Sequence, residues 1–196
     1  MPRLFTGIEI PGLIGDQLSR LRGGLPGARW IDRENLHLTL RFVGDVDMDV
    51  AEEIAGALAR VHRASFTLKL AEIGVLGTKK PHAIVARTDP SSELGELQAD
   101  HERLMKRIGL RPESRKFTPH VTLARLRGAS GRDIGDYLSA RGGFVAGPFQ
   151  VERFVLFSAR NSTGGGPYVI EEAYPLVTPG GHPDMDARGI ESWQNN

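Results

Sequence analysis

The chain has 196 residues, of which 40% are hydrophobic and 25% charged, and its net charge of +1 is ordinary for a globular protein. It contains no cysteine, which excludes disulfides, thiolate metal ligands and a cysteine nucleophile. No apolar run approaches the length of a membrane span, and Glu9 interrupts the apolar N-terminal stretch, so neither a membrane segment nor a signal peptide is expected. The cytoplasm is the expected location.

Hydrophobic periodicity predicts strands where apolar residues alternate and helices where they recur every three or four residues. In chain order, the first half is predicted to contain a strand at 4–10, a helix at 13–21, an extended piece at 28–31, a strand at 36–43, a helix at 47–61, and a hairpin of strands 66–76 and 83–88. The second half is predicted to contain a helix from 90 to 108, a strand at 117–126, a short helix at 133–139, and a final hairpin of strands 149–158 and 168–176.

Apolar density falls after residue 177, so we expect one domain over residues 1–177 and a disordered tail over residues 178–196. The interleaving of helices with hairpins is typical of an α+β fold with antiparallel strands. Two strands in similar contexts, one in each half, carry related strings: HLTL begins at His37 and HVTL at His120. This recurrence predicts two pseudo-symmetric lobes, each an antiparallel sheet with helices outside, and an active site in the cleft between them.

The two strings are candidate catalytic motifs. Residues i and i+2 of a strand point to the same face, so His37 accompanies Thr39 and His120 accompanies Thr122. A single His-x-Thr is more often structural, but two copies with the same flanking pattern favour function. Facing strands would place two imidazoles and two hydroxyls around one small anion, an arrangement suited to acid–base chemistry at phosphorus. Zinc is the competing interpretation, but no third ligand occurs at useful spacing, so no metal site is predicted.

The remaining histidines have no partner at motif spacing. A surface position is expected for His62 and His101, and a substrate contact is not expected for His82, in a hairpin turn. Nine basic residues against one acidic residue lie between Arg103 and Arg132, around the second motif. Such a stretch indicates nucleic-acid contacts only if its members converge in space.

These motifs resemble those of the 2H phosphoesterase superfamily, and within it the bacterial and archaeal RNA 2′,3′-cyclic phosphodiesterases, also called 2′–5′ RNA ligases. The resemblance extends over about residues 3–176. The segments that carry it are RLF from Arg3, ENLHLTLRFVG from Glu34, PHVTLAR from Pro119, LFS from Leu156 and GPY from Gly166.

The resemblance implies hydrolysis of an RNA-terminal 2′,3′-cyclic phosphate to a 2′-phosphate, with no metal or other cofactor and with reversible 2′–5′ ligation as an additional reaction. It assigns His120 as proton acceptor and His37 as proton donor. The hydroxyls of Thr39 and Thr122 would donate hydrogen bonds to the phosphate oxygens. It also implies that Arg125 contacts the phosphate.

Phe42 matches the family position that stacks on the base. Phe42 and Arg125 each lie five residues after a motif histidine, so strict alternation would turn both away from the site. A bulge, a strong twist or a strand end would be needed to bring them in. Arg41, four residues after His37, has the right parity and is therefore the reserve candidate for a substrate contact.

Two other functions remain open at this point. One is a nucleotide- or RNA-binding module without turnover, against which the intact His and Thr pairs argue. The other is a superfamily esterase acting on small cyclic nucleotides or 2′–5′ oligonucleotides. The basic stretch favours RNA ends bearing a 2′,3′-cyclic phosphate as the partner, and a monomer is expected.

Overall fold

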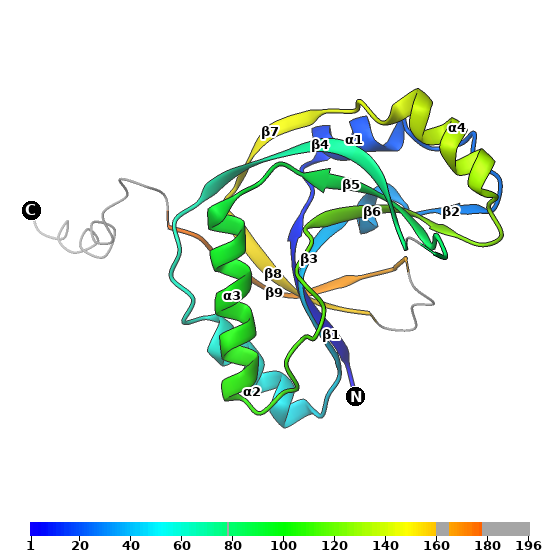
Figure 1. Ribbon diagram of the computed structural model, residues 1–196. Coiled ribbons are helices and arrows are strands. Elements are labelled where there is room, and N and C mark those ends of the chain that lie inside the picture. Colours follow the sequence, from blue (N-terminus) through cyan, green and yellow to red (C-terminus); the bar gives the residue numbers. More distant parts are fainter. Residues whose placement is uncertain (78, 160–164, 178–196) are drawn as a thin grey trace, which may run out of the picture.

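The computed structural model describes residues 1–77, 79–159 and 165–177, so the tail predicted for residues 178–196 lies outside the described residues. Helices and strands alternate as the periodicity predicts, and they are shown in Figure 1. Their bounds are β1 (Arg3–Glu9), α1 (Gly12–Ser19), β2 (Ala28–Trp30), a 3-10 turn (Arg33–Asn35), β3 (His37–Asp45), α2 (Met48–Leu58), β4 (Phe66–Leu76), β5 (Ala83–Thr88), α3 (Ser92–Arg107), β6 (His120–Leu126), α4 (Gly131–Arg141), β7 (Ala146–Val151), β8 (Arg153–Ser158) and β9 (Val169–Pro175).

The strands form one antiparallel sheet with two matching halves. Its order is β7-β4-β5-β6-β3-β1-β8-β9, and β2 pairs with β6. The halves meet where β3 lies beside β6, and Leu38 opposite Val121 is the residue pair that joins them. The predicted α+β fold is therefore confirmed, with the difference that the two sheets are continuous and both motif strands lie at their junction.

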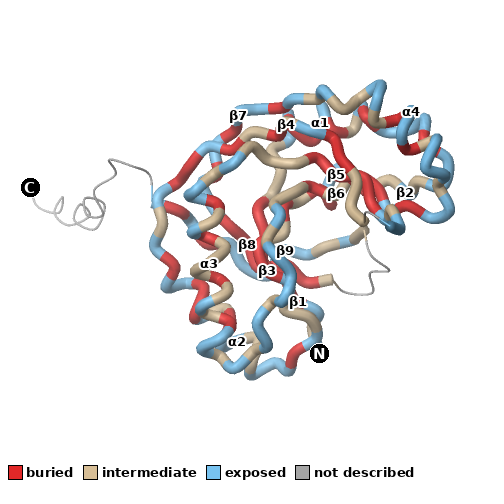
Figure 2. Tube along the Cα trace, in the orientation of Figure 1, coloured by how far each residue is buried: buried red, intermediate tan, exposed pale blue. Residues whose placement is uncertain are grey.

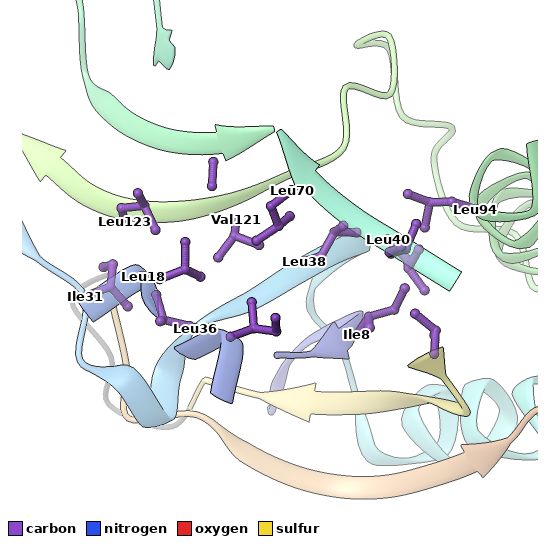
Figure 3. Close-up of a cluster of buried hydrophobic side chains, with 14 of the residues drawn as sticks. Ile8, Leu18, Ile31, Leu36, Leu38, Leu40, Leu70, Leu94, Val121 and Leu123 are labelled. Carbon is purple, nitrogen blue, oxygen red and sulfur yellow. The ribbon is translucent and has the colours of Figure 1, made fainter. Parts of the chain in front are cut away.

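The helices divide between the two halves. Helices α2 and α3 pack together, and α3 also packs on β3, whereas α1 contacts β7 and α4 contacts β4 (Figure 1). The buried residues follow the strands and the inner helix faces (Figure 2). Leu38 and Leu40 of β3 and Val121 and Leu123 of β6 point into one core (Figure 3). The second and fourth residues of each motif therefore anchor both strands in the core, as the alternation predicts.

None of the helices in the described part of the chain is long and apolar enough to cross a membrane.

The predicted strand 149–158 is wrong as a single element. The chain forms β7, which pairs with β4, and then β8, which pairs with β1 and β9. Glu152 alone separates these strands, so the chain passes from one half of the sheet to the other within one residue. Both segments alternate in the same way, and periodicity does not report which strand is the neighbour. The final hairpin is consequently β8 with β9.

His101 is fully buried, which corrects the expected surface position. It lies on α3, where its Nδ1 is 2.8 Å from the hydroxyl oxygen of Thr6, and its ring meets Phe154 edge-on at 4.6 Å. Burial lowers the pKa of His101 to about 3, because the imidazolium would lose its hydration. The folded protein therefore keeps this ring neutral well below the pH at which an unfolded histidine takes up a proton.

This burial predicts acid destabilisation. Above about pH 6.5 the ring is neutral in both the folded and the unfolded state, so it contributes no pH dependence to the free energy of unfolding. As the pH falls below that value, the ring takes up a proton in the unfolded chain but stays neutral in the folded chain. The free energy of unfolding then decreases by about 1.4 kcal/mol per pH unit. We expect His101→Gln to lose this part of the slope between about pH 6 and 4.5. Urea titrations at several pH values measure it, and parallel slopes for both proteins would contradict the prediction.

Candidate active site

The pairing of β3 with β6 brings the two motifs together. In an antiparallel pair centred on Leu38 and Val121, Thr39 lies across from His120 and His37 across from Thr122. All four of these residues belong to the same face, since they alternate with the buried anchors. The strands thus provide two imidazoles and two hydroxyls in a crossed arrangement.

Gly7 of β1 allows this packing beneath the first motif. It pairs with Thr39, and a Cβ at this glycine would lie 2.7 Å from the carbonyl oxygen of Leu38. The close approach of β1 to β3 therefore depends on the absence of a side chain at position 7.

Each motif strand contains a β-bulge at the same position. The residues that flank Leu40 pair with consecutive residues of β1, so Leu40 is an extra residue in β3. The residues that flank Leu123 pair with consecutive residues of β5, so Leu123 is an extra residue in β6. The fourth position of both motifs is thus bulged, which shifts the alternation of the residues directly after it.

The bulges explain how residues five positions after the histidines reach the cleft. Phe42 and Arg125 are exposed, whereas the residue before each is buried. Both line a cavity of about 180 Å³ together with His37 and Thr39. The structure thus contains the bulge that these two candidates require.

Arg41 does not line this cavity, because the bulge removes the parity with His37 on which its choice as the reserve candidate rested. It lines the neighbouring cavity beside His120, so its contact with a substrate stays a prediction. Its side chain is buried, and its Nε lies 2.6 Å from the Glu102 carboxylate of α3. Its guanidinium also donates hydrogen bonds to the backbone carbonyls of Phe42 and Arg111. Arg41 therefore links β3 to α3 and to the loop before β6.

His37 is held in a fixed orientation within an aromatic wall. Its Nδ1 lies 2.8 Å from the carbonyl oxygen of Asn35, so Nδ1–H donates and Nε2 remains available to the cleft. Phe5 and Tyr168 lie with ring centroids 4.9 Å from the imidazole, and Phe157 at 5.5 Å. Burial among these rings lowers the pKa of His37 to about 4, and the charges of Arg125 and His120 act in the same direction.

His120 is held by the same device. Its Nδ1 lies 2.7 Å from the carbonyl oxygen of Thr118, two residues earlier, which leaves Nε2 toward the cleft. Burial lowers the pKa of His120, and the charges of Arg87, Arg125 and His82 contribute. Both imidazoles are therefore bound to the residue two positions before them, and burial lowers the pKa of both.

Arg125 is the arginine whose charge acts on both histidines. Its guanidinium makes no hydrogen bond or ion pair with any other residue in the described ranges. An anion between the histidines would supply the missing counter-charge. A phosphate is the anion that two hydroxyls, two imidazoles and a guanidinium fit best.

The sequence reasoning missed several residues of the site. The aromatic wall comes from β1, β8 and the segment before β9, which are distant in sequence from His37. Asn35 holds both sides of this wall, because its carbonyl binds His37 and its side-chain oxygen accepts a hydrogen bond from the Tyr168 amide. A side chain at Gly166, whose φ is +100°, would collide with Asn35. The family-like segments at Arg3, Leu156 and Gly166 were the available signal.

A second cavity, of about 330 Å³, adjoins the first at Thr39 and Phe42. It is lined by His120, and His82 of the β4–β5 turn also reaches it. His82 therefore lies beside the motif residues, and the expectation that it makes no substrate contact stays a prediction. The basic stretch converges only in part. Arg115, Lys116 and Arg125 line these two cavities, whereas Arg103 and Arg107 line a separate one beside α2 and α3.

Comparisons with known proteins identify related sequences and structures. The family model described as LigT like phosphoesterase matches twice, over residues 8–86 and 84–168, and each match contains one His-x-Thr motif. The RNA 2′,3′-cyclic phosphodiesterase of Aeropyrum pernix is 36% identical over 120 residues, which cover 58% of this chain and 68% of that protein. The protein of the same name from Aquifex aeolicus is 27% identical over 152 residues, covering 74% and 81%. The crystal structure of E. coli LigT complexed with 3′-AMP matches with a TM-score of 0.73 at 26% identity, over 91% of this chain and 100% of that one.

Proposed function

The chain belongs to the LigT-like phosphoesterase family, and from this premise we propose that it is an RNA 2′,3′-cyclic phosphodiesterase that opens a terminal cyclic phosphate to a 2′-phosphate. The observation that carries the proposal is the crossed arrangement of two His–Thr pairs on β3 and β6, with Arg125 beside both histidines. A relative crystallised with 3′-AMP supports a nucleotide as the ligand. We further propose that residues 1–177 act as one domain, as a monomer in the cytoplasm.

The proposed reaction is an in-line displacement at phosphorus. His120 Nε2 accepts a proton from water while the water oxygen attacks phosphorus, the P–O3′ bond breaks, and His37 Nε2 gives its proton to O3′. The hydroxyls of Thr39 and Thr122 donate hydrogen bonds to the non-bridging oxygens, and Arg125 neutralises their growing charge. The assignment of the two proton roles follows the family resemblance, because both imidazoles have the same backbone partner. Phe42, 45% exposed at the cavity edge, stacks on the base.

The lowered pKa values predict where activity depends on pH. One histidine must be neutral and the other protonated, so kcat/KM should be bell-shaped and should lie on the acid side of pH 6.5, because both free-enzyme pKa values are lowered. The profile of kcat should move to higher pH, because a bound phosphate anion favours the imidazolium. Steady-state rates between about pH 4 and 9 measure both profiles.

Variants assign the limbs of this bell. Loss of His120 should remove the limb that requires a neutral base, and loss of His37 the limb that requires a protonated acid. Limbs exchanged between the two variants would reverse the roles of the histidines, and a kcat/KM maximum above pH 7 in the native protein would contradict the effect of burial.

Chelation should leave turnover intact. No group of three or more potential metal-ligating side chains occurs within the described ranges, and the transition-state charge is met by hydroxyls, imidazolium and guanidinium. We expect rates within twofold of the native value after treatment with EDTA and gel filtration. Loss of activity that one divalent cation restores would show that the site needs a metal.

The substrate is tested with adenosine 2′,3′-cyclic phosphate and with an oligoribonucleotide that carries the same end. The expected product is the 2′-phosphate, identified by phosphorus NMR, with a higher kcat/KM for the oligonucleotide. A 3′-phosphate would contradict the leaving-group assignment. Tight binding with no turnover of either compound would show that the protein is a binding module and not an enzyme.

A further inference from the structure

The segment that leads from α3 into the second motif has no secondary structure of its own (Figure 1). We call residues 111–118 the approach loop; no backbone-to-backbone hydrogen bond joins them to any other residue that the structure describes. Most of the side chains in the loop are exposed, and Phe117 packs on the hydrophobic core near its end. A loop with so few contacts opens readily unless side chains hold it. The carbonyl of Thr118, which orients His120, belongs to this loop.

Two charged residues that lie outside the approach loop hold its beginning. The Glu102 carboxylate of α3 accepts a hydrogen bond from the amide of Glu113 at 3.1 Å. The Arg41 guanidinium of β3 donates a hydrogen bond to the carbonyl of Arg111. Arg41 and Glu102 are themselves an ion pair, in which Nε lies 2.6 Å from a carboxylate oxygen and the side chains are only 8% and 18% exposed. The pair therefore acts as one unit, which joins β3 and α3 to the loop.

The Glu113 carboxylate continues this network inside the approach loop. It accepts hydrogen bonds from the backbone amide of Arg115 at 3.0 Å and from the Arg115 guanidinium at 2.9 and 3.1 Å. These contacts with Arg115, together with the charge of Arg41, lower the pKa of the Glu113 carboxyl to about 2, so it stays ionised. The backbone is thus held from Arg111 to Arg115, three residues before the carbonyl that orients His120.

Arg41 also holds the opposite wall of the site. Its guanidinium donates a hydrogen bond to the carbonyl of Phe42, the residue proposed to stack on the base. The bulge at Leu40 makes this possible, because Arg41 then faces α3 while Phe42 faces the cleft. A single buried guanidinium is thus bonded to the backbone of both walls of the cavity that Phe42 and His120 line.

The ion pair does something that apolar side chains could not do in its place. A buried pair adds little to stability beyond what well-packed apolar residues of similar volume would add. Apolar residues, however, could not bond the three backbone groups that this pair holds, which are the carbonyls of Phe42 and Arg111 and the amide of Glu113. The position of the approach loop is therefore the property that depends on the two charges.

We propose that Arg41 and Glu102 are positioning residues of the phosphodiesterase: their ion pair fixes the approach loop against β3 and so keeps the Thr118 carbonyl, and through it the His120 ring, in place. This rests on the proposed function. Proton transfer from water needs a base within about 3 Å, and a misplacement of about 1 Å costs on the order of 100-fold in rate. The pair acts through the backbone and takes no proton in the reaction.

The test compares two double variants with the native protein. Arg41→Met with Glu102→Leu removes both buried charges together, so the fold should persist while all three backbone contacts are lost. We expect kcat for adenosine 2′,3′-cyclic phosphate to fall by on the order of 10–100-fold. The control is Arg63→Met with Asp100→Leu, which removes a second ion pair of α3, 2.5 Å apart, that touches neither the approach loop nor the motif strands. The control should keep the native kcat.

Conservative variants separate geometry from charge. Arg41→Lys keeps the charge but carries all its donors on one nitrogen, so it cannot hold two carbonyls and the carboxylate together. We expect it to lose nearly as much kcat as the apolar double variant. Glu102→Gln keeps a carbonyl oxygen that accepts from the Glu113 amide, and it should retain most of the native kcat.

A spectroscopic measurement on His120 distinguishes positioning from a general loss of structure. The Nδ1–H that donates to Thr118 is followed by nitrogen-15 NMR of the imidazoles in the free protein. The Nδ1–H of His37, which Asn35 holds, is the internal reference. In the apolar double variant we expect the His120 ring to lose its single tautomer and its Nδ1–H to exchange faster with water. The His37 signal should stay native.

The possible outcomes separate the positioning role from the proposed function. Native kcat in the apolar double variant, an unchanged His120 signal despite a lower kcat, or an equal loss in the control would each overturn the positioning role. Should the apolar double variant not fold, equal kcat values for Arg41→Lys and Glu102→Gln would overturn it as well. Absence of turnover in the native protein would overturn the proposed function instead, and the NMR comparison would still report whether the pair orients His120.

Discussion

Replacing either His37 or His120 with alanine is expected to lower kcat on the order of 10²–10⁴-fold, the usual range for removing a general acid or base. The carbonyls of Asn35 and Thr118 hold each ring with Nε2 toward the cleft, so each imidazole is already oriented for proton transfer. Affinity should change much less, because the threonine hydroxyls and Arg125 remain. Single-turnover rates and equilibrium binding of a non-hydrolysable analogue measure the two quantities separately.

The double variant tests whether the histidines act together. Its loss should be far smaller than the product of the single losses, because removal of one partner already disables the paired proton transfer. The exposed His62, in the loop after α2 and outside the motif strands, provides a matched His→Ala control with native activity. Near-native hydrolysis in both single variants would show that the paired motif binds the substrate but takes no part in catalysis.

Removal of the Glu102 carboxylate is expected to lower the free energy of unfolding by about 3–5 kcal/mol. Glu102→Ala would leave the Arg41 guanidinium, in a residue only 7% exposed, without its counter-charge. The double change Arg41→Met with Glu102→Leu should cost much less, because both charges then leave the interior together. Urea denaturation measures all three proteins.

A surface pair is the control for this prediction. Arg132 and Asp136 lie 3.9 Å apart with their side chains 90% and 79% exposed, so Arg132→Ala should leave the unfolding curve unchanged. Equal losses in Glu102→Ala and in the double variant would show that the uncompensated charge is not the cause.

The elements that the sequence predicts well are those whose apolar pattern depends on local geometry alone. Strands 66–76 and 83–88 match β4 and β5 at both ends. The prediction of one strand at 149–158 was wrong because Glu152 lies at a change of sheet partner, and partners are set by contacts distant in sequence. The prediction of a surface position for His101 was wrong for a related reason. Its burial is produced by β1 and β8, which no pattern on α3 reveals.

The site shows the same division. The motif spacing predicts that His37 and Thr39 share a face, because two residues of a regular strand are enough to determine it. The positions of Phe42 and Arg125 depend on bulges that appear only when β3 and β6 are paired with β1 and β5. The resemblance to a family named these residues, whereas regular alternation alone selected Arg41, which binds Glu102 instead.

The shared bulge also has a consequence for the direction of the reaction. Of the side chains that the two motif strands turn toward the cleft, the histidines and threonines are the same in kind, and only Phe42 and Arg125 differ. A phosphate between the strands would meet nearly equivalent groups after half a rotation, so the histidines and threonines alone allow two opposite binding orientations. Phe42 and Arg125 select one of them, because Phe42 binds the base at one end and Arg125 places its charge at the other. In a protein carrying both Phe42→Arg and Arg125→Phe, the nucleotide would be expected to bind in the inverted sense. The histidine that now faces the leaving oxygen would then face the incoming one.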